Sequence, residues 1–385
     1  MVNYLGITEN PKFKFEFIFE VIRDFRKGGL HPNNYDEFMT LVKGLPPISK
    51  RSPADYLVFK ALNLSDLPPE DLQLVLREAQ ARAAEKAKRC WHPQAGIETC
   101  NVDKGGNILV SAAHSIQNNG ILSRISRDGH VMTFAKDKPG FDGKMIGRRL
   151  ASIFLGFCNK HDAIFRPIET LPYTGTVEQN FLFAYRGFIV AVHKKVEGTI
   201  LVDFGEQADN DIKETKKIFD RAIISKDYTI LETEVFELPA FYPVAASSSF
   251  YLDFDFEGNA IPHSDERMEN IYISLFPDNN KTYFLISYLK QDANLYKKLT
   301  DQLRKRNKLQ SDITILLAPH VGNIYFEPIY FTTFIEKQAD GIHSAFIDAQ
   351  FDYNIYNENN QVQKSYSLTP NNYLNNPYNL NFFGY

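Results

Sequence analysis

Cysteine and histidine residues gather in one short stretch of this chain, between Cys90 and Asp162. All three cysteines of the 385-residue sequence lie there, together with its single tryptophan and four of its nine histidines. The stretch covers less than a fifth of the length. Cysteine and histidine are the ligands that zinc prefers in proteins, so a metal site is the first hypothesis.

Four residues of this stretch form the preferred set of zinc ligands: Cys90, Cys100, Cys158 and His161. Cys158 and His161 are three positions apart, and on a helix such positions share one face. Cys90 and Cys100 are ten positions apart, so a loop has to bring them together. His92 is the substitute ligand. The alternative is three unrelated buried thiols, because free cysteine is among the most buried residue types.

The patterns of apolar and turn residues predict an α+β protein with several domains. Residues 1–89 are expected to form an N-terminal helical region, followed by a zinc-bearing ββα-like module over 90–170. A helical connector over 171–226 then leads to a β-rich α+β domain over 227–356. Residues 357–385 form an Asn- and Tyr-rich tail that is either flexible or ordered by contact.

Within the expected module, residues 108–113 predict a strand that ends at a histidine, and residues 130–134 predict a second strand. Residues 148–165 predict a helix, or a turn followed by a helix, that carries Cys158 and the metal ligand after it. In the C-terminal domain, residues 313–317 predict a further strand.

Basic residues are concentrated around the module. Residues 82–166 contain 14 Lys+Arg and 7 Asp+Glu, a local net charge of +7, whereas the whole chain carries −4, which leaves −11 for the rest. The overall charge argues against a general nucleic-acid-binding protein, but a basic module is a footprint for DNA or RNA. The alternative is a solvated basic face that contacts an acidic neighbouring domain.

The beginning of the sequence lacks the basic region and apolar run of a signal peptide. No apolar stretch approaches the roughly 20 residues that span a bilayer. Three unevenly spaced cysteines do not make a disulfide framework. We therefore expect a cytoplasmic protein without membrane contact.

A strand ending in a histidine, a loop with asparagine, a second strand and a helix with a C-x2-H pair resemble the HNH (ββα-metal) nuclease pattern with a treble-clef zinc. The resemblance covers about 75 residues, and the same block is similar to one found in uncharacterised bacterial proteins. It implies His114 as general base, Asn118 or Asn119 as the loop asparagine, and Asp162 as a ligand of a catalytic ion. Ala113 departs from the pattern, which usually has an acid or a second histidine there.

The resemblance implies metal-dependent cleavage of nucleic acid, as an effector in bacterial defence or as a toxin. A magnesium or manganese ion held by Asp162 would act as a Lewis acid on the scissile phosphate, while neutral His114 takes a proton from water. Four basic side chains would hold the backbone phosphates: Arg124, Arg127, Arg148 and Arg149.

The competing hypothesis is a non-catalytic protein-binding or sensor protein with a purely structural zinc site, whose C-terminal domain binds a protein partner. In that case His114 ties its loop to the module by a hydrogen bond, and Asp162 orients a zinc-bound histidine. The two hypotheses differ in whether His114 and Asp162 converge on a second, open metal position.

Overall fold

The computed structural model describes residues 12–13, 81, 83–134, 143–203, 206–264, 267–320, 322–348, 353–356, 362–366 and 374–384. Most of the expected helical region, 1–89, lies outside these residues, although residues 81 and 83–87 are helical. The chain divides into two compact units, of which the smaller comprises residues 11–87 and 196–203. In that unit β1 (Lys12–Phe13) pairs antiparallel with β6 (Val202–Asp203).

A seven-stranded sheet is the framework of the larger unit. Its strand order is β4-β3-β11-β8-β9-β10-β7, and every neighbouring pair is antiparallel. The strands are β3 (His130–Phe134), β4 (Gly143–Gly147), β7 (Leu231–Leu238), β8 (Val244–Phe250), β9 (Ile271–Asp278), β10 (Lys281–Leu289) and β11 (Ile324–Phe326).

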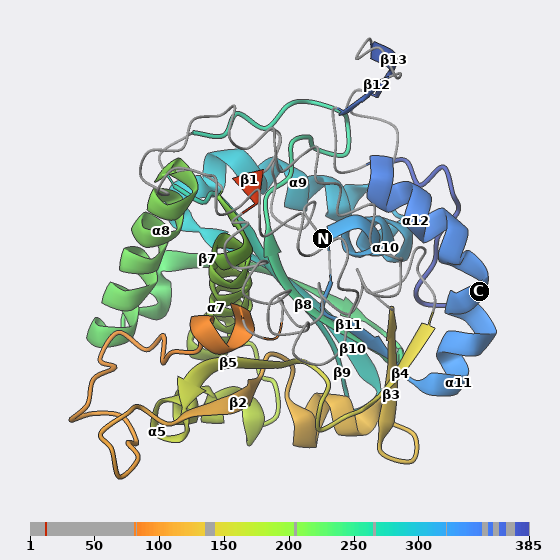
Figure 1. Ribbon diagram of the computed structural model, residues 1–385. Coiled ribbons are helices and arrows are strands. Elements are labelled where there is room, and N and C mark those ends of the chain that lie inside the picture. Colours follow the sequence, from red (N-terminus) through yellow and green to blue (C-terminus); the bar gives the residue numbers. More distant parts are fainter. Residues whose placement is uncertain are drawn as a thin grey trace, which may run out of the picture. The chain divides into compact units, whose positions relative to one another are not determined.

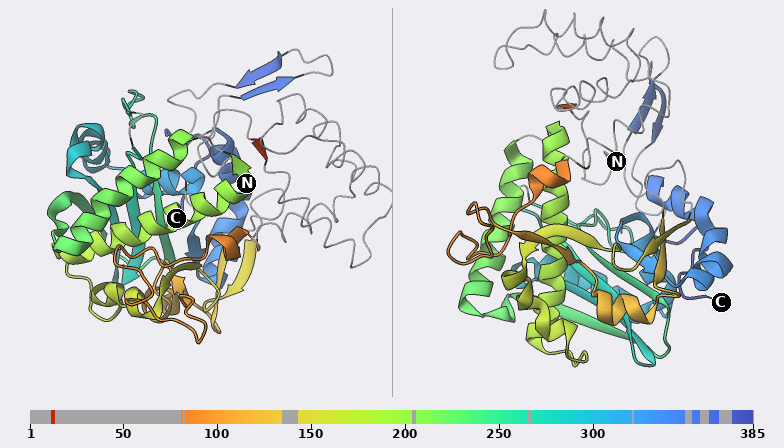
Figure 2. Two further views of the ribbon diagram at one scale, coloured as in Figure 1. Left: turned by 60° about the vertical axis from the view of Figure 1, so that its left-hand side comes forward. Right: turned by 60° about the horizontal axis from the view of Figure 1, so that its bottom comes forward.

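Helices cover both faces of this sheet, with α7 (Val177–Leu201) and α8 (Glu206–Ser225) on one side (Figures 1 and 2). The other side carries α9 (Ala293–Lys305), α10 (Leu309–His320) and α12 (Ala339–Asp348). All eight residues of β9 are buried, which is what a strand covered on both faces requires. The predicted α+β class is therefore confirmed.

Aromatic side chains join α7 and α8 to the sheet. The ring of Phe183 on α7 stacks on Phe276 of β9 with centroids 4.5 Å apart, and Phe219 on α8 meets Tyr272 edge to face at 5.2 Å. Gly187 permits the close approach of α7, because a Cβ atom there would lie 3.2 Å from the Ser248 carbonyl oxygen. Aromatic ring contacts, together with the small residue Gly187, therefore hold α7 and α8 against this face of the sheet.

A second, two-stranded sheet carries the Cys- and His-rich stretch. β2 (Val110–His114) pairs antiparallel with β5 (Ile153–Cys158), so that His114 lies opposite Ile153. Three short helical segments follow: α5 (Asn159–Asp162), the 3₁₀ segment η5 (Ala163–Phe165) and α6 (Arg166–Glu169). The π-helical segment η4 (Asn118–Leu122) and the β3–β4 hairpin are inserted between β2 and β5. The order of β2, β5 and α5 is strand, strand, helix.

The helix predicted over residues 148–165 is wrong for residues 153–158, which form β5. Backbone partners on both sides of this segment explain the difference. On one side it pairs with β2, and on the other the Arg89 and Trp91 N–H groups donate to the carbonyl oxygens of Leu155 and Gly156. The strand predicted over 130–134 forms, but as β3 it pairs with β4 and β11 rather than with β2.

The strand predicted over residues 313–317 is also wrong, because these residues lie inside α10. All five are buried, and a short apolar run buried on all sides has no periodicity that separates strand from helix. The domain boundaries stay predictions, but β3 from the expected module pairs with β11 from the expected C-terminal domain.

The remaining described elements are short. They are η6 (Tyr228–Ile230), η7 (Lys290–Asp292), α11 (Pro328–Tyr330), η8 (Phe331–Ile335), η9 (Glu336–Gln338), and the antiparallel pair β12 (Tyr353–Tyr356) and β13 (Val362–Tyr366). Among the described helices, none is both long and apolar enough to cross a bilayer.

Residues 374–384 of the expected tail pack into the core. Phe382 is fully buried, with its ring centroid 5.5 Å from that of Phe326 on β11. The Phe382 N–H group donates to Thr314 Oγ1 of α10, and the Tyr330 hydroxyl donates to the Phe382 carbonyl oxygen. This part of the tail is therefore ordered by contact.

We expect Phe382→Ala to lower the free energy of unfolding by about 3–5 kcal/mol, because it removes a fully buried ring and leaves a cavity. Urea unfolding followed by circular dichroism measures the change. Phe241→Ala is the matched control, since Phe241 is 38% exposed. Equal losses for the two variants would contradict a core position for the C-terminal segment.

Candidate metal centre

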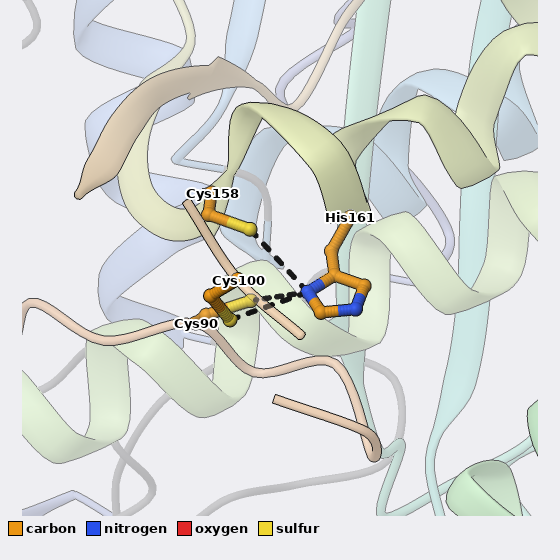
Figure 3. A group of neighbouring side chains, drawn as sticks. All are labelled: Cys90, Cys100, Cys158 and His161. Carbon is orange, nitrogen blue, oxygen red and sulfur yellow. Dashed lines mark hydrogen bonds between the residues drawn. The ribbon is translucent and has the colours of Figure 1, made fainter. Parts of the chain in front are cut away.

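Three thiols and one imidazole nitrogen point toward a single centre (Figure 3). The Sγ atoms of Cys90, Cys100 and Cys158 lie 3.5, 3.4 and 3.3 Å from Nδ1 of His161. The four atoms all lie within 4.8 Å of one another. The structure therefore brings together the four residues that the sequence favoured as metal ligands.

Local backbone hydrogen bonds bring the first two cysteines to this centre. Cys90 is held against β5 because the N–H group of the next residue, Trp91, donates to Gly156 at 2.9 Å. A turn places Cys100, whose N–H group donates to the Gly96 carbonyl oxygen at 2.8 Å. Both cysteines thus lie in loop segments whose backbone is fixed.

The other two ligands come from the junction of β5 and α5. Cys158 ends β5 and is the N-cap residue of α5, while His161 lies inside that helix. The Lys160 N–H group donates to Asn101 Oδ1 at 3.0 Å, which ties α5 to the loop that carries Cys100. Cys158 and His161 thus approach each other as residues three positions apart on a helix were predicted to do. They do so at the start of the helix rather than in its middle.

The distances match a tetrahedral zinc centre. With Zn–S near 2.3 Å and Zn–N near 2.0–2.1 Å, a tetrahedron places each sulfur about 3.5 Å from the nitrogen. Hydrogen bonds alone do not account for the arrangement, because one imidazole nitrogen has one lone pair and three thiols approach it. The group can thus hold a metal ion such as zinc, and its four protein ligands leave no open position in a tetrahedron.

Burial makes ionisation of these thiols unfavourable unless a positive charge lies nearby. It raises the pKa of Cys90 to about 12. Burial also opposes ionisation of Cys158, but hydrogen bonds from the Asn101 and His161 backbones and the neighbouring thiols lower its pKa overall. Metal ligation requires thiolates, so a divalent cation at the centre would supply the positive charge that the protein interior does not.

His92, the substitute ligand, does not belong to this four-residue group. Its ring stacks on that of His161 with centroids 4.1 Å apart and planes 9° apart. The Gln94 N–H group donates to His92 Nδ1 at 3.2 Å. Burial first, and then the charges of His161 and Lys216, lower the pKa of His92 to about 4. His92 therefore supports the ring of the candidate ligand His161.

His114 and Asp162 are not part of a second group of this kind. Across the described residues, the cysteine-rich centre is the one place where three or more potential ligands converge. His114 is half-buried, and its Nδ1 atom lies 2.9 Å from the Ala151 carbonyl oxygen. Burial raises the pKa of Asp162, which Arg186 partly offsets.

The expected nucleic-acid contacts are largely engaged within the protein. Arg124 pairs with Asp278 at 2.6 Å, and Arg127 lies 3.6 Å from Glu327. Arg148 donates to the side chain and backbone oxygens of Asn118, the expected loop asparagine, and approaches Asn119. Arg149 is exposed in the turn after β4. Three of the four arginines thus have partners within the protein.

Two charged residues that were not expected from the sequence act on His114: Glu169 on α6 and Arg186 on α7. Their side chains form an ion pair of 2.6 Å, and Arg186 is only 3% exposed. One signal was available, because Arg186 is the single charged residue in the apolar run 181–192. A buried arginine needs an acidic partner, so this pattern indicates a specific polar site.

Comparison with known proteins gives no match to this chain among protein-family models, curated proteins or solved structures.

His161→Ala should abolish stable metal binding, whereas His92→Ala should leave it in place. The first change removes a ligand atom from the centre, and the second removes only a stacking partner. Zinc per chain, measured by mass spectrometry after dialysis against a mild chelator, compares the two variants. Loss of zinc in the His92 variant with retention in the His161 variant would reverse the assignment.

Proposed function

We propose that this protein is a zinc protein whose Cys3His centre is structural, and that it acts by binding a partner rather than by catalysis. One observation carries the proposal. Three sulfurs and one nitrogen surround a common point at the spacing of a tetrahedral zinc ion. Structural zinc sites have four protein ligands, whereas catalytic sites keep one position for water or substrate.

The centre joins parts of the chain that are far apart in the sequence. Cys90 is 71 residues and Cys100 is 61 residues from His161. The α5 helix that carries His161 has four residues, too few to be stable alone. A metal ion would therefore supply much of the energy that fixes the loop of Cys100, the end of β5 and α5 against each other.

The test of a structural role is a comparison of wild type with Cys158→Ser. We expect about one zinc ion per wild-type chain and well below one in the variant, with a lower melting temperature. Chelation of wild type should lower the melting temperature similarly, and added zinc, but not magnesium, should restore it. A wild-type protein that binds no zinc, or that keeps its stability after metal removal, would contradict the proposal.

Metal-dependent cleavage of nucleic acid is the second candidate function. The order of β2, β5 and α5 and the position of His114 at the end of β2 favour it. Burial lowers the pKa of His114, so the imidazole is neutral near pH 7 and able to accept a proton. A magnesium or manganese ion would supply Lewis-acid stabilisation of the scissile phosphate. The support here is weaker, because three of the four expected arginines are engaged within the protein.

If cleavage occurs, His114→Ala should reduce its rate by about 100-fold or more, as expected for loss of a general base. The assay uses plasmid DNA and single-stranded RNA with added magnesium or manganese. His130→Ala is the matched control, since this histidine on β3 is exposed and its Nδ1 atom lies 2.8 Å from the Asp128 carbonyl oxygen. Wild type without cleavage, or equal rates in both variants, would remove this candidate.

A further inference from the structure

β7 forms one edge of the seven-stranded sheet in the described part of the chain, where it pairs only with β10. It has eight residues, contains neither proline nor lysine, and pairs with β10 without a shift in register. The opposite edge strand, β4, has five residues, with a glycine at each end and a lysine between them. Edge strands are commonly protected by short length, lysine, proline or a bulge. β7 is therefore the edge suited to accept a further strand.

The outer side of β7 presents backbone groups that the sheet does not use. Asp278 and Lys281 flank the two-residue turn between β9 and β10, so they form a hydrogen-bonded pair of the ladder. Such pairs alternate along a strand, and counting from this turn directs the N–H and C=O groups of Thr233, Val235 and Glu237 away from β10. Among the described residues, these groups have no backbone partner. The edge therefore offers donors and acceptors to an extended chain.

A groove of about 700 Å³ lies along this edge, and we call it the β7 groove. The consecutive residues Val235–Leu238 all line it. Neighbouring side chains of a strand point to opposite faces, so the groove follows the edge of β7 rather than one face of the sheet. The other wall is the end of α9 and the beginning of α10, joined through Asn307 with a φ of +57°. Two buried apolar side chains, Phe236 and Leu303, contribute to the lining.

The charged residues of the β7 groove have an excess of positive charge. Arg304 and Lys308 line the groove together with one acid, Glu237. Glu237 already pairs with Lys281 at 2.6 Å, and Arg304 pairs with Glu234. Lys308 is exposed and has no ion pair among the described residues. The groove therefore complements a segment that carries an acidic side chain.

A second copy of this chain fits the edge less well. Two β7 strands that pair antiparallel over their whole length would place Glu232 opposite Glu237. Like charges directly opposite each other destabilise a sheet. A different chain, with an acid where this strand has none to spare, avoids that repulsion.

We propose that the β7 groove binds an extended peptide segment of a partner protein, which adds to β7 as a strand and places an acidic side chain beside Lys308. The inference rests on the proposed function, because it assigns the site and the chemical class of the partner. Backbone hydrogen bonds to the edge supply affinity, and the adjoining groove selects the side chains.

The experiment selects ligands for the full chain from a phage-displayed library of random ten-residue peptides. Enriched peptides are synthesised with a fluorophore, and fluorescence polarisation measures their dissociation constants. Val235→Pro removes an outward N–H group without removing a ladder bond to β10, and should weaken binding by about tenfold or more. Val235→Ala is the matched control, because it keeps the N–H group, and it should bind nearly as tightly as wild type.

Lys308→Glu should weaken binding by about fivefold or more, whereas Lys308→Arg should preserve it, because the acidic side chain needs a positive charge. Hydrogen exchange of wild type needs no variant, and bound peptide should slow exchange of the Thr233, Val235 and Glu237 amides. Absence of enriched peptides, unprotected β7 amides, or equal binding by folded Val235→Pro overturns the proposal. A wild-type dimer that Val235→Pro converts to a monomer, seen by light scattering, also overturns it by assigning the edge to a second copy.

Zinc content and melting temperature of the same preparation separate this proposal from the metal centre. Peptide binding that depends on the β7 edge, in a chain that holds no zinc, would contradict the structural zinc centre and support the β7 groove. Stability that depends on zinc, without any peptide that depends on the edge, would overturn the β7 groove and leave the metal centre in place.

Discussion

The convergence of three sulfurs on one imidazole nitrogen is the interaction on which the local structure depends. Without a cation, burial keeps a thiol such as Cys90 protonated, and the loop of Cys100 has little apolar surface to hold it. With a cation, the same atoms become a cross-link between segments 61 and 71 residues apart. A bound cation would therefore add a further connection between the end of β5, α5 and the loop of Cys100, which backbone hydrogen bonds already hold.

Buried polar groups connect the small sheet to the large one. The Ser152 N–H group donates to the Tyr325 hydroxyl of β11 at 2.7 Å, and the Asn323 amide donates to Ser115 Oγ at 2.9 Å. Ser152 has a φ of +59°, a conformation that a serine adopts only when its surroundings fix it. The His114 ring reaches the same region, since its Nδ1 atom contacts Ala151. The position of His114 therefore depends on both sheets.

The four candidate metal ligands could be picked out from the sequence because cysteine and histidine are rare and their clustering is chemically specific. Sequence reasoning also gave the α+β class, since helices such as α7 and strands such as β9 and β10 have clear patterns. It failed at β5 and α10, where tertiary partners decide the conformation. The apolar run of α10 is buried throughout, and β5 accepts backbone hydrogen bonds from Arg89 and Trp91. Glu169 and Arg186 were missed because 17 residues separate them, and no spacing rule joins an α6 carboxylate to an α7 guanidinium.

The β3–β4 hairpin lies within the insertion between β2 and β5, yet its strands belong to the large sheet. The contiguous sequence that contains the candidate metal ligands is therefore not an independent structural module that could be transferred to another protein. Cutting at either end of the module would leave the edge of β3 without β11, its partner from near the end of the chain. Chain topology thus couples the folding of the candidate metal centre to that of the large sheet.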